Sequence, residues 1–103
     1  KPISLLINWE GLSKPVRGTI GYKGIGDGPI SIQVDNGWVN CSGKWKYANG
    51  SYNDSEGVNG VWAVACSNGT TVSGEYTSSK IGNGKGIGFD NKGKKVTIRY
   101  GKF

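Results

Sequence analysis

The two cysteines are the residues of this sequence with the most distinctive chemistry. Cys41 and Cys66 are the two cysteines of the sequence, which has no histidine that would complete a metal site with them. Two isolated thiols without CxxC spacing do not supply the four ligands of a structural zinc site. We therefore expect a Cys41–Cys66 disulfide, which predicts an oxidising compartment, either the periplasm or the outside of the cell. The alternative is two buried free thiols that pack as small hydrophobic side chains.

The lack of histidine also limits catalysis. The usual general base near neutral pH is missing, and Ser-His-Asp and Cys-His arrangements are excluded. Paired carboxylates leave a small hydrolase as an alternative. Most of the carboxylates fall in expected turns or in one long polar loop, where Asp commonly makes local hydrogen bonds: Asp27, Asp35, Asp54, Glu56 and Asp90. We therefore expect a protein that is not an enzyme and has no cofactor.

Glycine occupies every second position in two segments, 24–28 and 82–88. Loops that bind phosphate need a following helix, and we expect no helix after either segment. Alternating glycines instead remove the side chains from one face of a strand, so that a neighbouring tryptophan, or a flat ligand, can approach. We expect packing beneath a tryptophan. The segment 90–93 is similarly expected to be a turn rather than a calcium loop, because it lacks the acidic series of such loops.

Short strands must position these residues. Three segments each contain a turn of Asn, Asp and Gly followed by a strand that ends in an aromatic residue: 35–45, 66–76 and 90–100. Asn and Gly tolerate the positive φ of tight hairpin turns. We expect about eight strands in an antiparallel meander, closed into a small barrel or folded into a sandwich. The barrel is favoured because closure removes exposed edges. A chain of 103 residues is expected to form a single all-β domain, 1–103.

Alternation along the strands predicts which side chains face the core. Trp9, Trp45 and Trp62 are expected inside and Trp38 outside. In the last hairpin, Ile87 and Phe89 are expected to point inward, together with Val96, Ile98 and Tyr100. Residues 48–57 are expected to form the longest loop, which makes that segment a candidate for function. Because the chain begins at Lys1 rather than Met, we expect it to be a processed or trimmed piece.

Positive charge is concentrated near the C-terminus. The net charge is +6, and the last hairpin contains Lys94, Lys95, Arg99 and Lys102, with Lys85 and Lys92 nearby. This cluster predicts a basic outward surface that attracts anionic ligands. The alternative is that these lysines protect strand edges against aggregation. Nucleic acid is not expected as a partner, because Phe89 and Tyr100 are predicted to point inward and would not stack on bases.

Exposed aromatic side chains add a second kind of recognition. Trp38, Tyr47 and Tyr52 lie next to polar turns, where their rings can stack on sugar faces. The expected partners are therefore a polysaccharide or an anionic envelope surface, bound through these aromatics and the basic hairpin. The alternative is a structural or inhibitory protein that docks a larger protein partner through its sheet surface. No run of about 18 apolar residues occurs, so no transmembrane segment is expected.

Two resemblances point the same way. The segment 84–93 resembles the hairpin repeats of MORN proteins. The order of short motifs along the chain looks like that of small uncharacterised exported proteins of Gram-negative bacteria: Trp9-Glu10-Gly11, Cys41-x-Gly43, Trp62 to Cys66, Ser73-Gly74 and Val96 to Gly101. Both resemblances imply a secreted, non-enzymatic β domain that serves as a binding or accessory module.

Overall fold

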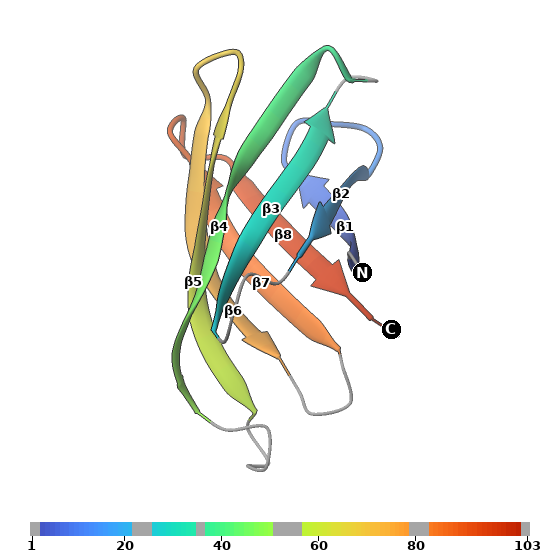
Figure 1. Cartoon of the computed structure of the whole chain (residues 1–103). Coiled ribbons are helices and arrows are strands. Elements are labelled where there is room, and N and C mark those ends of the chain that lie inside the picture. The colour runs from blue at the N-terminus through green and yellow to red at the C-terminus, as the bar shows by residue number, and fades with distance from the viewer. Residues whose placement is uncertain (1–2, 22–25, 35–36, 51–56, 79–82, 102–103) are drawn as a thin grey trace.

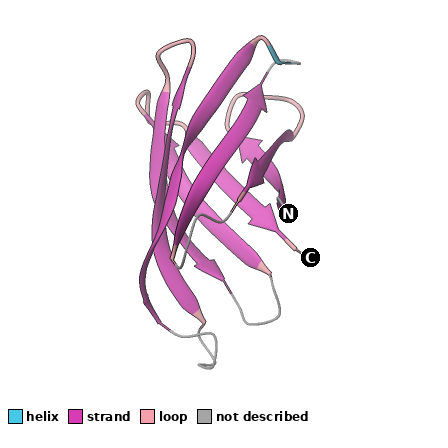
Figure 2. Ribbon diagram, viewed as in Figure 1, coloured by secondary structure: helices cyan, strands magenta, loops and turns pink. Residues whose placement is uncertain are grey.

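The chain folds into a closed antiparallel β-barrel (Figures 1 and 2). The computed structural model describes residues 3–21, 26–34, 37–50, 57–78 and 83–101. The strands are β1 (Ile3–Trp9), β2 (Val16–Ile20), β3 (Asp27–Val34), β4 (Val39–Gly50), β5 (Val58–Cys66), β6 (Thr71–Ser78), β7 (Gly84–Asp90) and β8 (Lys95–Tyr100). Each strand pairs with the next, and β8 pairs with β1 to close the sheet. The predicted all-β meander is confirmed as a barrel rather than a sandwich.

The two ends of the barrel differ in their connections. At the end that is uppermost in Figure 1, four hairpins join β1 to β2, β3 to β4, β5 to β6 and β7 to β8; we call it the turn end. Gly37, Gly69 and Gly93 lie in three of these hairpins with φ values of 92°, 89° and 83°, which confirms the expected positive φ. At the opposite end, the loop end, the chain connects β2 to β3, β4 to β5 and β6 to β7.

The core follows the alternation of side chains along the strands. It consists of Leu5, Ile7, Val16, Ile20, Ile30, Ile32, Cys41, Trp62, Val64, Val72, Val96 and Ile98. Trp62 is only 3% exposed, and the half-buried Trp9 and Trp45 pack against this cluster. Trp38 is 83% exposed. The prediction for all four tryptophans is therefore confirmed, and it depended on period-2 alternation alone.

The prediction of which face of β7 points into the barrel was wrong. Ile87 and Phe89 point outward and are 44% and 55% exposed, whereas the glycines of β7 face the interior. The reason is the bulk of the Trp62 side chain, which reaches β7 from β5. A Cβ atom at Gly88 would lie 2.8 Å from Cζ2 of Trp62, and one at Gly86 would lie 3.1 Å from its Nε1. The indole occupies the space that an inward side chain of β7 would need, as expected for glycines beneath a tryptophan.

The same complementarity recurs around the loop end. Four interior aromatic residues each have a glycine as direct cross-strand partner: Trp45 and Gly28, Trp62 and Gly74, Tyr76 and Gly60, Tyr100 and Gly84. Gly28, Gly60 and Gly84 let the partner ring lie close against backbone, whereas the Trp62 ring lies against Gly86 and Gly88 of β7. This part of the barrel is therefore filled by large rings over bare strand surface, together with the aliphatic side chains of Leu5, Ile20, Ile30 and Ile98.

Strand β4 is longer than predicted. It continues to Gly50, with a register shift between Tyr47 and Asn49 where it pairs with β5. The first part of the predicted loop 48–57 is thus a strand that bends at a bulge, as irregular pairing often does near the end of a barrel. Residues 51–56 lie outside the described residues.

Candidate functional site

The two cysteines are joined in a disulfide. Cys41 on β4 lies directly opposite Cys66 on β5, and the bond closes a loop with a sequence separation of 25. This confirms the predicted pairing and excludes the two free thiols. The bond lies near the turn end, and it stabilises the fold by restricting the unfolded chain.

Asp90 is the most enclosed carboxylate in the described part of the chain, with 8% of its surface exposed. It accepts hydrogen bonds from Nε1 of Trp9 at 3.0 Å and from the backbone N–H groups of Lys92 and Lys94 at 2.9 Å. Burial on its own would raise the pKa of Asp90, but these three donors and the nearby Lys94 charge outweigh it, so the pKa lies below the ordinary value. The carboxylate ties together the turn end, which is a structural role.

Other polar groups of the described chain do not form a metal site. No group of three or more His, Cys, Asp or Glu side chains gathers among residues 3–21, 26–34, 37–50, 57–78 and 83–101. Within the same ranges, no helix is long and apolar enough to cross a membrane. The candidate sites are therefore the cavities and the outer surface of the barrel.

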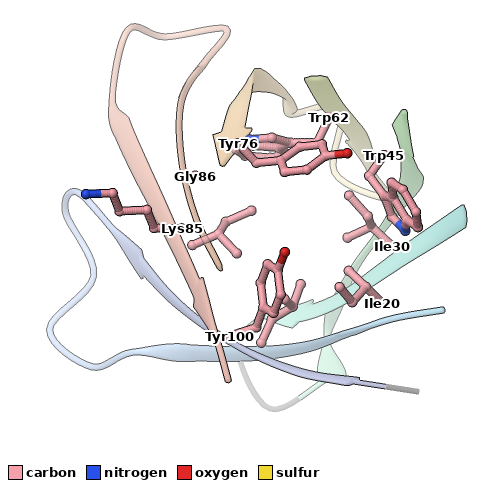
Figure 3. A pocket seen from close by; sticks show the side chains of 10 residues that line it. Ile20, Ile30, Trp45, Trp62, Tyr76, Lys85, Gly86 and Tyr100 are labelled. Atoms are coloured by element: carbon pink, nitrogen blue, oxygen red, sulfur yellow. The ribbon is translucent and has the colours of Figure 1, made fainter. Parts of the chain in front are cut away.

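The interior at the loop end holds a small cavity. Figure 3 shows Trp45, Trp62, Tyr76 and Tyr100 around it, with both tyrosine hydroxyls directed inward. Nε1 of Trp45 donates to the Gly21 carbonyl at 2.9 Å, Nε1 of Trp62 donates to the Glu75 carbonyl at 3.1 Å, and the Trp45 and Tyr76 rings meet edge to face at 6.1 Å. The remaining space is about 40 Å³. That volume holds roughly two or three water molecules and is too small for a sugar ring.

A larger hollow lies on the outer face. We call it the outer groove: it has a volume of about 610 Å³ and runs over β5 to β8, with Ala48 and Asn49 of the extended β4 at its rim. Its outward side chains are Asn59, Val61, Glu75, Thr77, Lys85, Ile87, Thr97 and Arg99. Lys85 on β7 lies directly opposite Arg99 on β8. The groove thus combines two adjacent cations, one carboxylate, amide and hydroxyl groups, and an apolar floor.

The predicted basic residues are only partly brought together. Arg99 lines the outer groove. Lys95 is on the same outward face of β8 but lies four residues closer to the turn end, outside the groove lining. Lys94 is exposed in the β7–β8 turn, where its backbone binds Asp90. Lys102 lies outside the described residues.

The predicted aromatic residues do not form one site. Trp38 lies in the turn just before β4, whereas Tyr47 lies nine residues further along the chain, toward the loop end of β4, which is roughly 30 Å for extended chain. Tyr52 lies outside the described residues. Sequence reasoning missed Asn49, Asn59 and Thr77, which alternation alone does not bring beside Arg99, because that neighbourhood depends on the order of strands around the barrel.

Comparison with known proteins supports the fold. No protein-family model matches the chain, and no curated protein sequence matches it. Among solved structures, the chain is similar to a redesigned β-barrel, mFAP1, bound to DFHBI, with a TM-score of 0.68 and 12% sequence identity over 98% of this chain and 92% of that one. The likeness at this identity concerns the barrel architecture alone.

Proposed function

We propose that the protein is a non-catalytic binding domain that is periplasmic or secreted, and that it binds an acidic glycan in the outer groove. The observation that carries this proposal is the direct pairing of Lys85 and Arg99 within a groove of about 610 Å³. The Cys41–Cys66 disulfide supports an oxidising compartment.

The charge pairing favours an anionic ligand. Lys85 and Arg99 bring two positive charges next to each other on neighbouring strands. The planar guanidinium of Arg99 suits a bidentate contact with a carboxylate or sulfate group, and the ammonium of Lys85 suits the same kind of group.

The other side chains of the groove favour a saccharide over a simple ion. The amide of Asn59 and the hydroxyls of Thr77 and Thr97 match the hydroxyl groups of a sugar. Val61 and Ile87 provide an apolar floor for the C–H face of a sugar ring. Binding sites typically combine an apolar surface with a few polar groups in this way.

The barrel interior is the alternative location for a ligand. The similar barrel mFAP1 has DFHBI bound. In the present chain the interior at the loop end is filled by Trp45, Trp62, Tyr76 and Tyr100, and about 40 Å³ remains. We therefore place the site on the outer face.

The test is a titration of the oxidised protein with polygalacturonate, a carboxylated glycan, by isothermal calorimetry at low and at physiological salt. We expect the double variant Lys85→Glu, Arg99→Glu to lose at least about tenfold in affinity, because both charges are reversed. The wild type should bind more weakly as salt screens the charges. The matched control, Lys14→Glu with Lys44→Glu, makes the same change in net charge at exposed positions outside the groove and should retain affinity. Equal binding by all three proteins would refute the proposed site.

A second function, docking of a protein partner, is favoured by one observation. Phe89 is 55% exposed on the outward face of β7, and Ile87 is 44% exposed on the same strand. Contiguous exposed apolar side chains mark sites of contact with another protein, and these two side chains are adjacent on one face of β7. Under this function, Phe89→Ser with Ile87→Ser should abolish capture of a specific partner, and the charge-reversed groove variant should still capture it.

A further inference from the structure

The register of the barrel extends the two cations of the outer groove into a longer series. Outward residues that are directly opposite one another run across six strands in the order Thr77, Lys85, Arg99, Leu6, Arg17 and Gln33. We call this series the cationic row. It crosses the seam where β8 pairs with β1, and it contains three cations and no acidic side chain.

The far end of the cationic row enters a second hollow. This second hollow has a volume of about 290 Å³ and lies over β1 to β3. Its outward side chains are Ser4, Arg17, Thr19, Ser31 and Gln33. Leu6 lies between Arg99 and Arg17. Its side chain is half-buried, so it does not separate the outer groove from the second hollow along the row.

We infer that a linear acidic polysaccharide crosses the β8–β1 seam along the cationic row, and that Arg17 binds a further acidic group of the same ligand. This inference rests on the proposed function, because it starts from the anion held by Lys85 and Arg99. From Lys85 to Arg17 the row spans three steps between neighbouring strands, which is about 14 Å. That length exceeds a single sugar ring, so the ligand is an oligomer with repeated acidic groups.

The side chains around Arg17 favour a saccharide among the polyanions. Ser4, Thr19 and Ser31 are successive cross-strand partners and present a row of small hydroxyls beside the arginine. Bases of single-stranded nucleic acid are usually held by aromatic rings, and the described residues of the cationic row include no aromatic side chain. The row also bends around a barrel between two separate hollows, which suits a flexible chain better than a flat membrane.

Glu75 sets a boundary to the proposed path. It lines the outer groove opposite Ile87, diagonally from Lys85, and its negative charge repels an anionic ligand that strays from the cationic row. Neutralising Glu75 should therefore increase affinity, whereas neutralising any cation of the row should decrease it. A general loss of folding would lower the affinity in every variant, so it would not explain affinity changes of opposite sign at neighbouring residues.

The experiment compares galacturonate dimers and octamers by calorimetry, with the oxidised wild type and the variants Arg17→Gln, Lys85→Gln and Glu75→Gln. Arg17→Gln should lower the affinity for the octamer about fivefold, the value of one exposed ion pair, and leave the dimer unchanged. Lys85→Gln should weaken both oligomers, and Glu75→Gln should strengthen both. Lys14→Gln, in the exposed β1–β2 turn, is the matched control for Arg17→Gln and should behave like the wild type.

The outcomes separate the inference from the proposed function. Weaker binding by Lys85→Gln together with an unchanged octamer affinity in Arg17→Gln would overturn the inference and leave the proposed function standing. No binding of either oligomer to the wild type would overturn both. Binding of single-stranded DNA or anionic vesicles that requires Arg17, without binding of the octamer, would overturn the assignment of the ligand as a polysaccharide. Thermal unfolding of each variant checks that the barrel is intact.

Discussion

The turn end and the loop end of this barrel are stabilised by different kinds of interaction. At the turn end, the Cys41–Cys66 bond and the hydrogen bonds to Asp90 link strands through specific atoms. At the loop end, rings such as Trp62 and Tyr100 lie against glycines of β7. The turn end should therefore respond to reduction and to pH, because its links are covalent and ionic. The loop end should respond to changes of side-chain volume, because its stability depends on packing.

The largest effect is expected from the loss of volume at the loop end. Trp62→Ala should reduce the free energy of unfolding by about 3 to 5 kcal/mol, because it leaves a cavity above Gly86 and Gly88 that the surrounding backbone cannot fill. Chemical denaturation monitored by circular dichroism measures this. Trp62→Phe, which keeps a ring, should cost less. A loss below about 1 kcal/mol for Trp62→Ala would contradict a loop end that depends on packing.

Removal of the disulfide tests the turn end. The double variant Cys41→Ala, Cys66→Ala should lose about 3.5 kcal/mol, the value expected when a loop of this length is no longer closed in the unfolded chain. The same loss should appear when the wild type is unfolded under reducing conditions. Trp62→Ala with the disulfide removed should show nearly additive losses if the two ends are independent.

The sequence was sufficient to predict features that depend on neighbours along the chain. The turn glycines Gly37, Gly69 and Gly93 follow from local chemistry, and the faces of Trp38 and Trp45 follow from alternation. The disulfide was predictable because two cysteines offer one pairing. In each case the information lies within one hairpin or in the composition.

Features that depend on distant strands could not be predicted in this way. In β7, alternation alone allows either face of the strand to point inward, and hydrophobicity favours Ile87 and Phe89 as core residues. The face that does point inward is determined by the bulk of Trp62, which belongs to another hairpin. In the candidate site, Arg99 was identified from the local cluster of charge. Arg17 was not, because it is brought close by the closure of β1 on β8.

Acid should weaken the turn end through Asp90. The carboxyl has a lowered pKa in the folded protein and an ordinary pKa of about 3.9 in the unfolded chain. The unfolded chain therefore binds more protons between these values, so stability rises with pH through this window and is fully present above it. As the pH falls through about 4 and then through the folded pKa, this contribution is lost. Urea denaturation between about pH 2 and pH 7 should show that Asp90→Asn is less stable than the wild type at pH 7 and approaches it in acid. A constant difference across the range would contradict the ionic role.

The smallest effect is expected at Trp38, which lies at the turn end and is 83% exposed. Trp38→Ala should change the free energy of unfolding by less than about 0.5 kcal/mol, because little apolar surface returns to water when the ring is removed. The same substitution at Trp62 removes an identical ring from the loop end, so the two variants compare the ends directly by chemical denaturation. A loss at Trp38 similar to that at Trp62 would mean that packing stabilises both ends. If Trp38→Ala keeps both the stability and the affinity for polygalacturonate of the wild type, Trp38 takes no part in binding and recognition depends on the outer groove.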